Sequence, residues 1–188
     1  MKMKVQSSAR IVFIMSIAMV IAIYPFNKAC AATAKEIDVS VDAALDRFVK
    51  EVKGADEFLK AAKGILVVPK VIQGGLIVGA EYGEGALRID SKTVDYYSLI
   101  SGSFGYQIGA QQKDIILVFM DQAALGKFRS SENWRGGVDA KITVVNMGVD
   151  DSLDSMKFKA PVIGIVFGQK GLMAGATLEG SKFSKLKK

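Results

Sequence analysis

The sequence predicts an α+β domain with a mostly antiparallel, strongly curved or barrel-like sheet, helices at its N-terminus and one short inserted helix. Two observations support this fold class. Short apolar, β-branched runs recur along the chain without the regular strand–helix alternation of a parallel α/β fold. Glycines such as Gly79, Gly83 and Gly85 lie inside these runs, where they favour bends or a close approach between backbones.

Residues 1–31 are predicted to be a secretory signal peptide. A charged start precedes an apolar run at residues 11–24, and small residues follow at 29–31. The run is shorter than the roughly 20 residues that a membrane-spanning helix needs, which disfavours an uncleaved anchor. We expect cleavage after Ala31 and a periplasmic or secreted protein. The alternative is a lipoprotein modified at Cys30, which the polar residues before that cysteine disfavour.

Two helices are expected after a short polar leader at residues 32–39, which is predicted to be mobile. Ser40 is a plausible N-cap, and a second, shorter helix is expected at 57–63. The first helix is amphipathic, with one apolar face formed by Val41, Leu45, Phe48 and Val52. This face either packs on the sheet, which we favour because the polar side mixes acids and bases, or inserts into a membrane.

The strands follow as apolar runs separated by turn residues. The first run ends at Pro69, and Lys113-Asp114 is expected to form a turn into a central strand buried on both faces at 115–120. Asp121 is predicted to cap a short helix at 122–129. The other strands are expected at 76–81, 93–101, 103–111, 139–147, 161–167 and 172–178, before a frayed basic tail. Residues 40–188 should therefore form a single domain.

The charge of the chain gives little support to a nucleic-acid partner. The 188 residues hold 25 Lys and Arg against 19 Asp and Glu. Four of these cations lie in residues 1–31, which hold no acid, so the remainder holds 21 cations against 19 acids. A nearly balanced domain without a basic stripe is not expected to bind nucleic acid.

The composition also argues against an enzyme. The chain has no histidine, and its one cysteine lies in the predicted signal peptide, which excludes His-based triads, cysteine nucleophiles and Cys/His metal sites. Glu81 and Glu84 could form a carboxylate pair, but we interpret them as exposed acids at a turn. We therefore predict no catalytic residue, no metal and no cofactor.

Several motifs carry a family resemblance that extends from about residue 39 to the C-terminus. They are AKGILVVPK, GAEYGEGALRI, YYS, GSFGYQIGAQ and GQKGLMAGATLEGSK. As a set they resemble the bacterial branch of the SYLF domain family, also described as the Las17-binding or actin-regulator domain. The resemblance implies a non-enzymatic binding domain. Eukaryotic members bind phosphoinositide membranes and are thought to insert an amphipathic helix at the start of the domain.

We therefore predict a lipid or membrane-surface binding module of the bacterial envelope, with anionic phospholipid as its partner. The expected lipid-binding residues are Phe48, Lys50, Lys53, Lys63, Lys70, Trp134 and Arg135. Trp134 could anchor a lipid interface or cap the end of the core. The alternative function is an envelope protein-interaction or structural domain without a lipid ligand, and an apolar ligand cavity inside the barrel is a third possibility.

Overall fold

The computed structural model describes residues 32–75, 78–104, 111–148, 150–153, 160–170 and 178–188. The predicted signal peptide therefore lies outside the described residues, as do most of the strand expected at 172–178 and residues 105–110 of the strand expected at 103–111. The helices are α2 (Ala34–Glu51), α3 (Ala55–Lys60) and α4 (Gln122–Ser130). The strands are β1 (Gly64–Gly75), β2 (Val78–Ile89), β3 (Lys92–Phe104), β4 (Gln111–Phe119), β5 (Asn133–Arg135), β6 (Thr143–Asn146), β7 (Val162–Lys170) and β8 (Lys182–Leu186).

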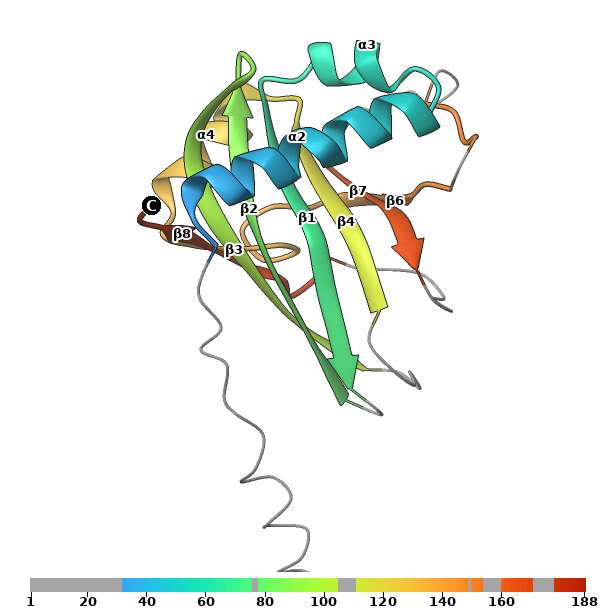
Figure 1. The fold of residues 1–188 in the computed structure, drawn as a ribbon. Coiled ribbons are helices and arrows are strands. Elements are labelled where there is room, and N and C mark those ends of the chain that lie inside the picture. Colours follow the sequence, from blue (N-terminus) through green and yellow to red (C-terminus); the bar gives the residue numbers. More distant parts are fainter. Residues whose placement is uncertain (1–31, 76–77, 105–110, 149, 154–159, 171–177) are drawn as a thin grey trace, which may run out of the picture. The chain divides into compact units, whose positions relative to one another are not determined.

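The eight described strands form one curved, half-barrel sheet in the order β5-β8-β3-β2-β1-β4-β7-β6 (Figure 1). All neighbouring strands are antiparallel except β6 and β7, which are parallel. The predicted fold class is thus confirmed. The predicted central strand is also confirmed, because β4 lies between β1 and β7 and its residues from Ile115 to Phe119 are fully buried.

The two faces of the sheet carry two separate cores, which we call the α2 face and the α4 face. On the α2 face, Val67, Ile116 and Ile165 pack against the apolar side of the helix. On the α4 face, alternate residues of the same strands surround an aromatic cluster formed by Tyr97, Phe119, Phe128, Trp134 and Phe183. Figure 1 shows α2 crossing β1 and β2 near one end, while both strands continue beyond the helix. Part of the α2 face is therefore left without a covering helix.

Helix α2 begins at Ala34, so the prediction of an N-cap at Ser40 was wrong. Thr33 forms a capping box, in which its side chain accepts from the Glu36 backbone N–H and the Glu36 carboxylate accepts from the Thr33 backbone N–H. Residues 34–39, expected to belong to the polar leader, are helical. The extra turn adds Ile37 to the buried face of the helix, which also carries Phe48. The interpretation that this helix packs on the sheet is confirmed.

Strand β1 does not stop at Pro69 as predicted. The pairing registers on both sides of the strand shift between residues 67 and 72, and Lys70 has a positive φ of 52°. Proline is tolerated at such a bulge because it has no N–H to donate to the ladder. The Lys70 N–H instead donates to the buried carboxylate of Asp114, which also pairs with Arg47 of α2. Asp114 therefore lies within β4, and the predicted turn at that position was wrong.

The C-terminal segment also differs from the prediction. Residues expected to form a frayed tail make strand β8, which pairs with β3 and β5 and buries Phe183. The strand expected at 139–147 is shorter in the structure and covers only β6. The helix expected after Asp121 is confirmed as α4, because the Asp121 side chain accepts from the Ala124 N–H.

Candidate functional site

An exposed apolar row crosses the uncovered part of the α2 face. Ile72 of β1 lies opposite Tyr82 of β2, which lies opposite Ile100 of β3. Their side chains are exposed to 58%, 50% and 50% respectively. Directly opposed residues on neighbouring strands have Cβ atoms about 5 Å apart, so the three side chains form one continuous apolar row. We call these three residues the apolar row.

Small residues lie next to the apolar row, on the side away from α2. Gly74, Ala80 and Gly102 are cross-strand neighbours in the following row on the same face, and all three are exposed. A Cβ added to Gly74 or Gly102 would meet no heavy atom within 4 Å. No bulky side chain of these three positions therefore shields the apolar row from an approaching surface.

Cations border the apolar row on two sides. Lys70 lies at the β1 bulge, whereas Lys182 is the cross-strand partner of Ile100, and Arg135 is the partner of Lys182. Lys70 and Arg135 are exposed, and Lys182 is half-buried. Among the described residues, none of these three cations has an ion-pair partner. We call the apolar row together with these cations the basic-apolar surface.

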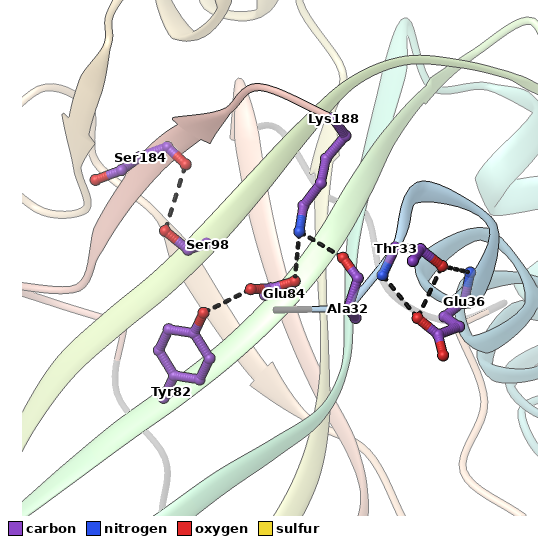
Figure 2. Close-up of polar contacts among 8 residues, drawn as sticks. All are labelled: Ala32, Thr33, Glu36, Tyr82, Glu84, Ser98, Ser184 and Lys188. Atoms are coloured by element: carbon purple, nitrogen blue, oxygen red, sulfur yellow. Dashed lines mark hydrogen bonds and ion pairs between the residues drawn. The ribbon is translucent and has the colours of Figure 1, made fainter. Parts of the chain in front are cut away.

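One acid, Glu84, lies beside the apolar row and is neutralised by Lys188. The Lys188 Nζ lies 3.1 Å from Glu84 Oε2 and also donates to the carbonyl oxygen of Ala32 (Figure 2). The hydroxyl of Tyr82 donates to Glu84 Oε1 at 2.7 Å. Partial burial of the phenol, with this hydrogen bond, raises the pKa of Tyr82 to about 12. Figure 2 thus shows the first and last described residues, Ala32 and Lys188, held together beside Glu84, which Tyr82 of the apolar row contacts.

Two of the residues predicted to bind lipid are buried in the cores. Phe48 is fully buried, and its ring centroid lies 4.9 Å from that of Phe167. Trp134 is 2% exposed and lies in the aromatic cluster, 5.2 Å from Phe128 between ring centroids. Neither side chain reaches the surface of this structure. For Trp134, the interpretation as a cap on the core agrees with this position.

The remaining predicted residues are divided among three places. Lys50 and Lys53 line an open pocket where α2 gives way to α3. Lys63 lines a separate pocket of about 450 Å³ between α2, α3 and the ends of β1 and β2. Only Lys70 and Arg135 belong to the basic-apolar surface, and they lie in β1 and β5 with β2, β3 and β8 between them. Sequence reasoning missed the apolar row and Lys182, although the alternation of β2 and β3 indicated which residues share a face.

A second pair of charges lies inside the domain. Lys113 Nζ and Glu81 Oε1 are 2.8 Å apart, with side chains only 1% and 5% exposed. Glu81 shares the α4 face with Leu87, whereas Glu84 lies on the α2 face. The interpretation of Glu81 and Glu84 as exposed turn acids was therefore wrong, and the two carboxylates do not converge.

The described residues contain no group of His, Cys, Asp and Glu side chains that could hold a metal ion. No helix among the described residues is long and apolar enough to cross a membrane.

The model of the Ysc84 family, described as Las17-binding protein actin regulator, matches residues 100–188. Residues 100–188 are therefore similar to the Ysc84 (SYLF) domain. The match covers the C-terminal part of the resemblance, and its residues supply Ile100, Arg135 and Lys182 of the basic-apolar surface, as well as Lys188 beside it. The family description names a binding protein and not an enzyme. A comparison with curated proteins found no match.

Proposed function

We propose that this Ysc84 domain is a non-enzymatic module that binds the surface of anionic phospholipid membranes in the bacterial envelope. The observation that carries the proposal is the basic-apolar surface. It combines exposed aliphatic side chains, a tyrosine and cations that have no ion-pair partner among the described residues. Tyrosine is enriched where a membrane meets water, and aliphatic side chains gain free energy when they leave water.

The charges of this surface complement an anionic membrane. Each Lys or Arg held close to such a membrane contributes about 1 kcal/mol of binding free energy at ordinary ionic strength. Glu84 would oppose this attraction, but its charge is balanced by Lys188. The family description names a binding protein, and the resemblance to lipid-binding SYLF domains supports lipid as the ligand.

We also propose that the protein is exported. The signal-peptide pattern of residues 1–31 favours a periplasmic or secreted location, where bacterial phospholipid headgroups are the available anionic surface. An envelope protein that docks on the apolar row is the alternative partner.

Vesicle flotation tests the proposed function. The protein is expressed as the full chain, purified in its processed form and mixed with vesicles of phosphatidylethanolamine and phosphatidylglycerol, or of phosphatidylcholine alone. We expect it to float with the anionic vesicles at low salt and to float less at high salt, because salt screens exposed charges beyond about 10 Å at 0.1 M. The neutral vesicles are the control. A protein that stays at the bottom with every vesicle contradicts the proposal and directs the search to protein partners.

A further inference from the structure

We infer that the domain docks on a lipid surface through the uncovered part of its α2 face, so that the apolar row enters the interface. This inference rests on the proposed function and assigns the face that carries it out. It differs from what the SYLF resemblance implies, which is insertion of the amphipathic helix at the start of the domain. The structure argues against insertion of helix α2 into the membrane and favours docking through the exposed sheet.

Helix α2 is poorly suited to insertion. Its apolar side is buried in the core of the α2 face, and it would have to leave the sheet and expose residues such as Val67 and Ile116. Ion pairs also hold it in place, since Arg88 of β2 bonds Asp42 at 2.7 Å and Arg47 bonds Asp114 of β4. Its solvent side offers only isolated apolar residues, of which Val39 is the most exposed at 61%.

The uncovered sheet needs no rearrangement to meet a membrane. The apolar row is already exposed, and the glycines and alanine beside it leave its approach open. Lys70 lies in β1 two residues before Ile72, and Lys182 with Arg135 lies on the β8 and β5 side of the row. Cations on both sides of an apolar centre can contact lipid phosphates while the aliphatic side chains enter the interface.

The contacts of Lys188 fix the position of Ala32, the first described residue. Lys188 holds the Ala32 carbonyl beside Glu84, next to the apolar row (Figure 2). After cleavage at Ala31, the new amino group would add a positive charge on this side. If Cys30 is lipidated instead, its acyl chains would be attached two residues before Ala32 in the sequence.

Site-specific labelling tests the docking face. Residues 32–188 contain no cysteine, so a Cys30→Ser background allows a single label at each chosen position. An environment-sensitive fluorophore is attached to Ile72→Cys, Ile100→Cys, Val39→Cys or Val94→Cys, and anionic vesicles are added. We expect a blue shift and increased emission for the labels at 72 and 100. We expect no change at Val39 on α2 or at Val94 near the other end of β3, which are the matched exposed controls.

The outcomes separate the inference from the proposed function. Flotation with a response at Val39 but none at Ile100 would overturn the sheet face in favour of α2. Flotation with no response at any label would also overturn it, because another face would then bind. If neither flotation nor a label response occurs, the proposed function fails as well.

A pair of charge variants tests the cations of this face. Lys70→Gln with Lys182→Gln should weaken partitioning into anionic vesicles about 30-fold, from about 1 kcal/mol for each cation. The control, Lys92→Gln with Lys127→Gln, removes the same net charge from two exposed lysines outside this surface and should lower partitioning far less. Equal losses in the two variants would mean that net charge alone drives binding, and the assigned face would be rejected. Circular dichroism confirms that both variants are folded.

Discussion

Gly85→Ala should destabilise the domain by about 3 kcal/mol or more, because it forces an atom into the neighbouring backbone. A Cβ at Gly85 would lie 2.0 Å from the carbonyl oxygen of Val67 and 2.8 Å from the Cα of Val68. Both atoms belong to β1 where its register shifts around Pro69. Neither can move aside by a rotamer change, so β1 and β2 would have to separate locally. Urea or thermal unfolding measures the loss.

Gly74→Ala is the matched control on the neighbouring strand. A Cβ there meets no heavy atom within 4 Å, and the position is exposed. We expect its free energy of unfolding to change by less than about 1 kcal/mol. If the two substitutions cost the same, the close approach of β1 to Gly85 is not present in solution.

Glu81→Gln should lower the free energy of unfolding by about 3–5 kcal/mol, since it leaves the Lys113 ammonium buried without its counter-ion. The two charged groups lie 2.8 Å apart on the α4 face and are almost inaccessible to water. Replacing both residues, as in Glu81→Met with Lys113→Met, should recover much of the loss because no buried charge remains. The coupling energy follows from the double-mutant cycle measured by chemical unfolding.

Asp56→Asn provides the exposed control for this pair. Asp56 and Lys60 lie one turn apart in α3, and their side chains are 55% and 72% exposed. Breaking a solvent-exposed pair typically costs less than about 1 kcal/mol. A loss for Glu81→Gln no larger than that for Asp56→Asn would show that water reaches the inner pair.

Much of the fold could be predicted because it depends on local patterns. A continuous apolar run without polar alternation requires burial on both faces, and Ile115 to Phe119 form a strand with neighbours on both sides. Asp121 caps α4 because a short acidic side chain can reach the first free N–H groups of a helix. The glycines of β2 were expected to permit close backbone contact, and Gly85 does so.

The predictions of secondary structure were wrong where a contact with a residue distant in the sequence decides the local structure. Pro69 ends a strand by the usual rule, but here the Asp114 carboxylate accepts the N–H of the following residue and the strand continues through a bulge. The basic C-terminal segment shows no long apolar run, yet pairing with β3 and β5 makes it a strand. These partners lie far away in the sequence, so no local pattern reveals them.

The candidate site shows the same division between pattern and tertiary structure. The sequence by itself determined the curved, mostly antiparallel sheet, the apolar side of the first helix and the absence of histidine and of cysteine after Cys30. Only the tertiary structure decided that Phe48 and Trp134 are buried while Ile72, Tyr82 and Ile100 are exposed. Alternation along a strand specifies which residues share a face. How far a covering helix extends over that face depends on packing between distant segments, and α2 leaves the end that carries the apolar row uncovered.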